Sequence, residues 1–301
     1  IYVRREGEGK PIVLVHGIAL THDMWRYQVP YLKQNGYEVV SIDLRGFGSS
    51  QYYKFGKAAE YTYERWAKDL GLILQAYDLQ QVTLVGYSMG GAVAMQYMLD
   101  SNWRVDKLVL IAATGPNMQE TGLPFPPDDA RLAATCVGLN TFAELIKKID
   151  QVGSDQAVKA ADDAFEAFLR LTFPTIYLMD FADGIDGVKW LRKMFDSCSR
   201  EALVGGLKQM HDVKIPLRVG TINTPTRICH GILDPFVPFG LGEHQKKLIA
   251  DADLTPLIGG HGLFFEQADE LNRALAGGQV RQIPECPFYL CPVRWVKCNK
   301  G

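Results

Sequence analysis

The stretch VTLVGYSMGGAVAMQYML, residues 82–99, decides the fold. It starts with a short apolar run of strand type and ends in a segment of helical type that is rich in small side chains. Between these lie Gly86, Ser88 and Gly90 in the spacing G-x-S-x-G, followed by Gly91. A sharp turn from strand to helix brings the residues two before and two after the serine very close together, and only glycine fits there. The stretch therefore predicts a strand–turn–helix unit that presents the Ser88 hydroxyl at the carboxyl edge of a sheet.

Segments of strand type and helical type alternate on both sides of this unit. Further strands are expected at residues 1–5, 12–15, 39–42, 108–111, 226–229 and 253–257, and helices at 63–77, 242–250 and 264–276. Continuous apolar strands are typical of a sheet that is covered on both faces. Their alternation with helices favours βαβ units. The predicted fold class is α/β, with a mostly parallel, doubly wound sheet.

The middle of the chain differs from both ends. Gly115-Pro116 interrupts the alternation, and apolar residues at helical spacing then continue to about residue 217 without a convincing strand. We therefore predict a helical cap inserted into the core. The expected divisions are an α/β core at 1–115 and 218–278, the cap at 116–217, and a Cys-rich C-terminal extension at 279–301.

Composition excludes several classes of function. The 301 residues include 32 Lys and Arg against 34 Asp and Glu, a net charge of -2, so we expect no nucleic-acid partner. The longest strongly apolar run, residues 108–113, is too short to span a membrane. The first residues lack the apolar region of a signal peptide, so a cytoplasmic location is expected. Cys286, Cys291 and Cys298 have a poor zinc spacing, and neither a metal nor a cofactor is predicted.

A serine hydroxyl needs a base to become a nucleophile, and the base needs an orienting acid. On an α/β sheet both should follow later strands, in the order Ser, acid, His. His261 lies in GGHG just after the strand expected at 253–257, and Asp234 lies in HGILDP just after the strand expected at 226–229. We predict that they serve Ser88 as base and acid. Asp251 and Asp253 compete as acids but precede the last strand.

Two backbone N–H groups are needed for the oxyanion that forms during acyl transfer. Met89 follows the nucleophile, and Ile18 follows His16-Gly17 after an early strand, so both are predicted donors. His16 is interpreted as structural, and His230 as packed at a strand end. The other histidines, which we expect at the surface, are His22, His211 and His244. Asp43 and Arg45 either hold their own loop or contact substrate.

These motifs together resemble the α/β-hydrolase superfamily. HGIALTHDMW, DLRGFGSS, GYSMGG, HGILDPFVP and GGHG stand in that family's order over about residues 1–277, with the middle segment where the family carries its cap. The chain is most similar to the cofactor-free haloperoxidase, aryl esterase and lactonase group. The resemblance implies Ser88, Asp234 and His261 as a catalytic triad, with Ile18 and Met89 as the oxyanion hole. Ile18 stands where that group often has an aromatic residue.

The expected activity is hydrolysis of small to medium acyl or aryl esters through an acyl-enzyme. Several alternatives use the same triad: a lactonase, including one for acyl-homoserine lactones, a carbon–carbon bond hydrolase, and a perhydrolase. A small-molecule receptor with a vestigial triad is the non-enzyme alternative. Haloalkane dehalogenases and epoxide hydrolases need Asp in place of Ser88 and are disfavoured. The expected partner is a small-molecule ester or lactone, and a homodimer is left open.

Overall fold

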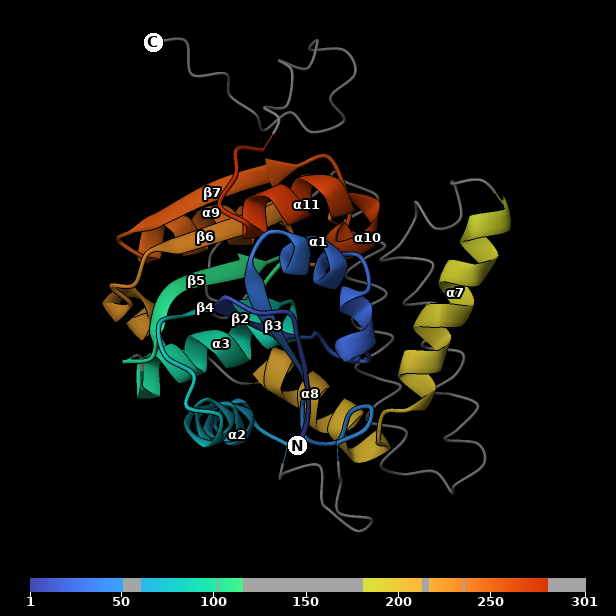
Figure 1. Cartoon of the computed structure of the whole chain (residues 1–301), viewed down its shortest axis with the longest axis horizontal. Helices are drawn as coiled ribbons and strands as arrows, with labels where there is room; N and C mark the ends of the chain where they lie inside the picture. Colours follow the sequence, from blue (N-terminus) through green and yellow to red (C-terminus); the bar gives the residue numbers. More distant parts are fainter. Residues whose placement is uncertain (51–60, 102, 116–180, 213–216, 235, 281–301) are drawn as a thin grey trace.

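A twisted sheet forms the centre of the computed structural model, which describes residues 1–50, 61–101, 103–115, 181–212, 217–234 and 236–280 (Figure 1). Within these residues the sheet has seven strands in the order β1-β3-β2-β4-β5-β6-β7. They are β1 (Tyr2–Glu6), β2 (Lys10–Val15), β3 (Tyr37–Asp43), β4 (Val82–Tyr87), β5 (Val105–Ile111), β6 (Thr226–Gly231) and β7 (Ala252–Leu257). Only β1 is antiparallel to its neighbour. The prediction of a mostly parallel α/β sheet is confirmed.

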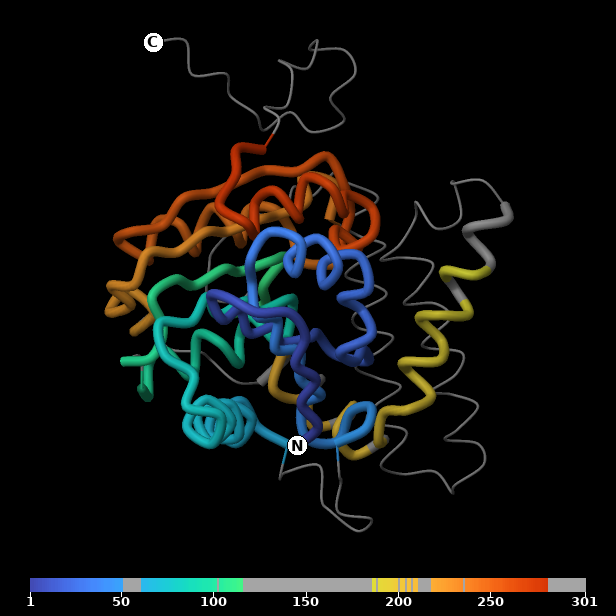
Figure 2. Tube along the Cα trace, in the orientation of Figure 1, coloured from blue at the N-terminus to red at the C-terminus, as the bar shows by residue number. Residues whose placement is uncertain are grey.

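Helices cover both faces of the sheet, as expected for buried parallel strands. The apolar core of the described residues accordingly has two large clusters, and a third, small cluster contains Phe236, Val237 and Leu241. One large cluster contains side chains of α2 (Tyr63–Ala76) and α3 (Met89–Asp100). The other large cluster contains side chains of α1 (Gln28–Gln34), α10 (Leu263–Glu266) and α11 (Ala268–Leu275). Figure 2 follows the chain from the blue and green segments to the orange ones: it begins at the edge strand β1, and from β4 onward the strands follow in sequence to the other edge at β7.

The predicted helix at 63–77 illustrates how the pattern makes the structure. Thr62 begins α2 with a side-chain oxygen that accepts a hydrogen bond from the N–H of Arg65. Such a cap stabilises a helix by about 1 kcal/mol. Trp66, Leu70 and Leu74 then lie one turn apart and are fully buried in the first cluster. Burying a side chain of this size contributes roughly 1.5–3 kcal/mol.

The expected last helix is interrupted. Gln267 has φ −130° and ψ 39°, which is not helical, and it separates α10 from α11. Glu266, at the end of α10, accepts a hydrogen bond from the N–H of Gly260 at 2.5 Å. The break at Gln267 thus leaves a short helix whose last carboxylate holds the loop before His261.

Two helices of the predicted cap are described, α7 (Phe181–Asp196) and α8 (Arg200–Asp212). In the view of Figure 1, α7 lies to one side of the sheet and α8 lies lower in the picture than the central strands. The rest of the predicted cap, 116–180 and 213–216, and most of the predicted extension, 281–301, lie outside the described residues. After α8 the chain continues through η3 (Leu217–Thr221) and β6 to α9 (Phe239–Leu248). No helix among the described residues has the length and apolar character needed to cross a membrane.

Candidate active site

The turn between β4 and α3 holds Ser88 in a rare backbone conformation, with φ 51° and ψ −119°. Such a conformation costs a residue with a side chain about 1–3 kcal/mol. Two hydrogen bonds support it: the N–H of Ser88 donates to the carbonyl of Ile111 at 2.9 Å, and its carbonyl accepts from Gly91 at 2.9 Å. A Cβ on Gly86 would lie 2.5 Å from the Gly90 carbonyl oxygen. The glycine spacing therefore allows the sharp turn that the sequence predicted.

Ser88, His261 and Asp234 meet at the carboxyl edge of the sheet. The Nε2 atom of His261 lies 3.1 Å from the Oγ of Ser88, and its Nδ1 atom lies 2.7 Å from the Oδ2 of Asp234. The three residues come from the loops after β4, β7 and β6 and are exposed by only 1%, 2% and 6%. Because an ionised carboxylate only accepts hydrogen bonds, the Nδ1 of His261 carries a proton and the lone pair of Nε2 faces Ser88.

The Asp234 carboxylate is itself held by the backbone. Its Oδ1 atom accepts hydrogen bonds from the N–H groups of Phe236 and Val237, both at 2.8 Å. One oxygen therefore faces the backbone while the other faces His261. His230 lies close by and is fully buried, with Nε2 2.8 Å from the Val237 carbonyl. Burial lowers the pKa of His230, which favours a neutral ring that braces this loop.

The two competing acids, Asp251 and Asp253, do not contact His261 in the way that Asp234 does. Asp253 pairs with Arg227 at 3.0 Å on the neighbouring strand. Asp251 is exposed and precedes β7, at the opposite end of that strand from His261. Neither therefore takes the place of Asp234 beside His261.

Tyr87, which sequence reasoning treated only as a variable position of G-x-S-x-G, contacts His261 directly. Its hydroxyl donates to the His261 carbonyl at 2.9 Å, and its ring centroid lies 5.1 Å from the imidazole. On the other side Phe236 lies 5.1 Å from the same imidazole. Burial raises the pKa of Tyr87 well above its ordinary value, so the hydroxyl stays a donor. The G-x-S-x-G pattern does not predict the hydrogen bond from Tyr87, because the acceptor is a main-chain atom far away in the sequence.

The two predicted oxyanion donors lie together beside the serine. A Cβ on Gly17 would be 3.1 Å from the Cβ of Ser88, so the loop before Ile18 runs along the nucleophile. Met89 begins α3, where the backbone N–H has no partner within the helix and the helix dipole favours negative charge. Gly206 of α8 lies above both: a Cβ there would be 2.9 Å from the Met89 Sδ and 3.0 Å from the Ile18 Cδ1.

His16 is structural, as interpreted from the sequence. The backbone N–H of Leu44 donates to its Nε2 at 2.9 Å, and its Nδ1 lies 2.7 Å from the Gly17 carbonyl. The first bond requires an unprotonated Nε2, so Nδ1 is the donor in the second. Burial lowers the pKa of His16, in keeping with a neutral ring.

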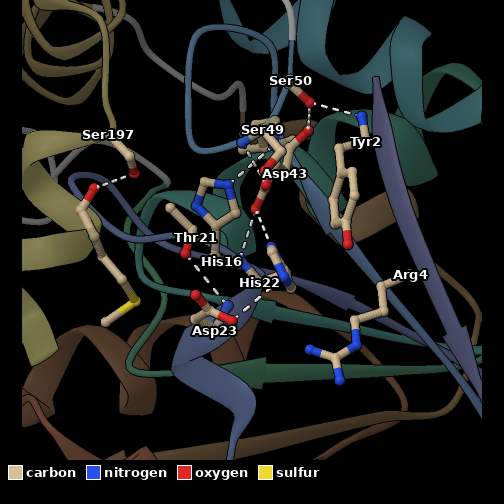
Figure 3. Close-up of polar contacts among 12 residues, drawn as sticks. Tyr2, Arg4, His16, Thr21, His22, Asp23, Asp43, Ser49, Ser50 and Ser197 are labelled. Carbon is tan, nitrogen blue, oxygen red and sulfur yellow. Dashed lines mark hydrogen bonds and ion pairs between the residues drawn. The ribbon is translucent and has the colours of Figure 1, made fainter.

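The expectation of a surface position is wrong for His22. Its side chain is only 11% exposed, and Nδ1 lies 2.8 Å from the Oδ1 of Asp43 (Figure 3). The sequence misled because the residues around His22 show no strand or helix period, so a loop position was assumed to face solvent. Arg45 pairs with Asp69 at 2.6 Å, which favours the structural reading of that loop. His211 is in α8, and its side chain lies outside the described part of the structure.

A metal centre finds no support in the described residues. No group of three His, Cys, Asp or Glu side chains there could hold a metal ion. The buried Cys229 lies on β6, where burial raises the pKa of its thiol to about 12. A thiol with that pKa is a poor nucleophile near neutral pH.

A serine, aspartate and histidine in this chain order, on the carboxyl edge of a parallel sheet, define the class of α/β hydrolases. The chain belongs to the family described as alpha/beta hydrolase fold, whose pattern matches residues 10–268.

Relatives in sequence and structure agree with this family. The AB hydrolase superfamily protein YisY of Bacillus subtilis (strain 168) is 29% identical over 92% of this chain and 94% of that protein. The non-heme chloroperoxidase CPO-A1 of Kitasatospora aureofaciens is 34% identical over 91% and 94%. The solved esterase EaEST from Exiguobacterium antarcticum is similar at a TM-score of 0.75 and 26% identity, over 92% and 94% of the two chains. The chain is thus a hydrolase-fold protein with esterase and haloperoxidase relatives.

Proposed function

We propose that the protein is a serine carboxylic-ester hydrolase that works through an acyl-enzyme on small to medium acyl or aryl esters. The observation that carries the proposal is the 3.1 Å approach of the His261 Nε2 to the Ser88 Oγ, with Asp234 at 2.7 Å behind the imidazole. A base with an orienting acid is what a serine needs to attack a carbonyl near neutral pH. The esterase among the structural relatives adds support.

In the proposed reaction the Ser88 oxygen attacks the ester carbonyl carbon while His261 Nε2 takes its proton. The carbonyl oxygen becomes an oxyanion and accepts hydrogen bonds from the N–H groups of Ile18 and Met89. His261 then gives its proton to the leaving alcohol, and the acyl group stays on Ser88. Water repeats the sequence on the acyl-enzyme and releases the acid. Asp234 stabilises the imidazolium in both halves.

Apolar side chains around the site favour apolar acyl groups. Ile18 and Met89 are buried and lie beneath α8, and Met210 of the same helix packs against Phe236 and Val237 of the acid loop. The described part of the cap thus contacts both the oxyanion side and the acid side of the site. An acyl chain that enters between them replaces water contacts with apolar ones, which contributes about 25 cal/mol per Å² of buried apolar surface.

Ser88→Ala tests the proposal. We expect turnover of p-nitrophenyl acetate and butyrate to fall by several orders of magnitude, with the circular dichroism spectrum unchanged. Ser101→Ala is the matched control, because Ser101 ends α3, the helix that begins after Ser88. A fluorophosphonate should label wild type on the peptide that contains Ser88. Unchanged ester turnover in Ser88→Ala would refute the nucleophile. A panel that includes lactones then separates esterase from lactonase.

Perhydrolysis is a second candidate, favoured by the chloroperoxidase relative. In it hydrogen peroxide replaces water: a peroxide oxygen bonds to the acyl carbon, the Ser88–acyl bond breaks, and the released proton passes through His261 to Ser88. The product is a peracid, which can oxidise a halide by two electrons to the hypohalous acid and return to the carboxylic acid. Bromination of monochlorodimedone in acetate and peroxide measures it. Activity that is absent in wild type, or retained in Ser88→Ala, argues against this candidate.

A further inference from the structure

The loop that carries Ile18 is tied to the end of β3 at both of its ends. At its start, Leu44 donates its backbone N–H to the His16 Nε2 at 2.9 Å. At its end, the backbone N–H of His22 donates to the Asp43 Oδ1 at 2.7 Å, and the His22 Nδ1 lies 2.8 Å from the same oxygen. Between the two ties lies Ala19 with φ 62°, a conformation that side chains rarely adopt. The ties therefore hold a strained segment next to the nucleophile.

Asp43 is a rigid anchor for the second tie. Its side chain is fully buried, and its Oδ2 accepts from the backbone N–H of Ser49 at 2.8 Å. Gly48, at φ 55°, passes so close that a Cβ there would collide with the carboxylate. The backbone carbonyl of Asp43 accepts from the Ser50 hydroxyl, which itself accepts from the N–H of Tyr2 at 2.8 Å (Figure 3). A carboxylate with this many fixed donors has little freedom to move.

The charges around His22 favour its protonated form. Burial alone would lower its pKa, but the hydrogen bond and charge of Asp43, with Asp23 at 3.3 Å, raise the pKa above its ordinary value, and Arg4 opposes this weakly. Burial would raise the pKa of Asp43, yet the bond from the His22 side chain and the backbone donors at His22 and Ser49 keep it below its ordinary value. The Tyr2 ring covers His22 at a centroid distance of 4.8 Å. A charge-assisted hydrogen bond of this kind is about twice as strong as a neutral one.

We propose that His22 and Asp43 are positioning residues for the oxyanion hole: their pairing fixes the loop that aims the Ile18 N–H at the reacting carbonyl. The inference rests on the proposed ester hydrolysis and adds a pair of side chains that never touch the substrate. A donor that stabilises an oxyanion must be in place before the reaction, and a loop with a strained Ala19 stays in place only if both ends are held.

Two substitutions at His22 separate the hydrogen bond from the ring. In His22→Asn the amide nitrogen can reach the place of the imidazole Nδ1 and keep the bond to Asp43. In His22→Leu the bond is lost, while the backbone N–H of residue 22 still serves Asp43, so the fold is expected to survive. His244→Leu on α9, a histidine outside the site, is the control. Active-site titration with a fluorophosphonate gives kcat per competent serine in each variant.

We expect His22→Leu to lower kcat by at least about tenfold. This loss should be smaller than the 10²–10³-fold loss that follows removal of a whole oxyanion donor. Its KM should stay within about threefold, because a misplaced oxyanion donor weakens the transition state more than the ground state. A trifluoromethyl ketone, whose adduct on Ser88 carries an oxyanion, should lose affinity in parallel. His22→Asn should recover most of the activity, and His244→Leu should match wild type.

The outcomes distinguish this inference from the proposed function. If the fluorophosphonate does not label Ser88 in wild type, ester hydrolysis itself fails and the inference falls with it. If Ser88 is labelled but His22→Leu keeps wild-type kcat and ketone affinity per titrated site, the hydrolase stands and the positioning role is overturned. A lower melting temperature of His22→Leu with unchanged kcat per site also overturns it, since that is the result of a purely structural role.

Discussion

Replacing Ser88 by glycine should make the protein more stable than replacing it by alanine. Both changes remove the hydroxyl and its contact with His261, so they differ mainly in the backbone. Ser88 has φ 51° and ψ −119°, and a Cβ makes this conformation cost about 1–3 kcal/mol. Glycine relieves that strain but loses about 0.5–1 kcal/mol through the greater freedom of the unfolded chain. At the middle of both ranges, the net gain of Ser88→Gly over Ser88→Ala is about 1 kcal/mol.

Urea unfolding followed by circular dichroism measures the difference. The midpoint should rise in Ser88→Gly with an unchanged slope, since the slope reports the surface exposed on unfolding. The melting temperature should rise by a few degrees, at about 2–4 °C per kcal/mol for chains of roughly this size. The matched control is Ser101, which is extended at φ −168°. There glycine should be no more stable than alanine.

The reasoning is refuted if Ser88→Gly is no more stable than Ser88→Ala, because the positive φ would then carry no cost. A gain of equal size at Ser101 would also refute it, since the effect would not belong to the turn. The expected result would mean that the sheet and α3 impose an unfavourable backbone conformation on Ser88.

Three further predictions concern the groups around the imidazole and the loop before it. Asp234→Asn should lower kcat by about four orders of magnitude with ester substrates, because an amide cannot hold the imidazole and its charge as the carboxylate does; a loss under tenfold would contradict the assigned acid. Tyr87→Phe should lower the free energy of unfolding, measured in urea, by about 1–3 kcal/mol, because the buried His261 carbonyl loses its donor. An unchanged urea midpoint would show that this hydrogen bond does not stabilise the protein. The stability difference between wild type and His22→Asn should be greatest between about pH 3.8 and 6.5, the ordinary pKa values of Asp and His. The stability difference should shrink above that range, because His22, with its raised pKa, loses its proton. It should also shrink below that range, because Asp43, with its lowered pKa, gains a proton. A stability difference that is flat from pH 3 to 9 would contradict the ion pair.

The fold was predictable because its signals are local. The central parallel strands β2, β4 and β5 each contain a short apolar run, and the stripe that contains Trp66 and Leu70 repeats at helical spacing. The order Ser88, Asp234, His261 could be read in the same way, since each follows a strand and parallel strands bring their carboxyl ends to one edge. The break at Gln267 could not, because a helical period continues on both sides of it.

Contacts between distant segments were the part that the sequence could not supply. The bond from Tyr87 to the His261 carbonyl joins residues 174 positions apart, and its acceptor is a main-chain atom that every residue has. His22 lies 21 positions before Asp43, and no period links them. Gly206 raises the same difficulty: a glycine within a helix normally weakens it, and only the closeness of Ile18 and Met89 explains it.

The absent side chain at Gly206 has a consequence for how such an enzyme could change its substrates. At this position α8 approaches the residues below it closely, and the nearest atoms are the side-chain ends of Ile18 and Met89. A methyl or isopropyl group at this single position would push against the side chains of Ile18 and Met89 and would add no atom to Ser88, His261 or Asp234. A substitution on α8 can therefore alter which substrates fit, while the residues that would carry out the reaction stay on loops of the sheet.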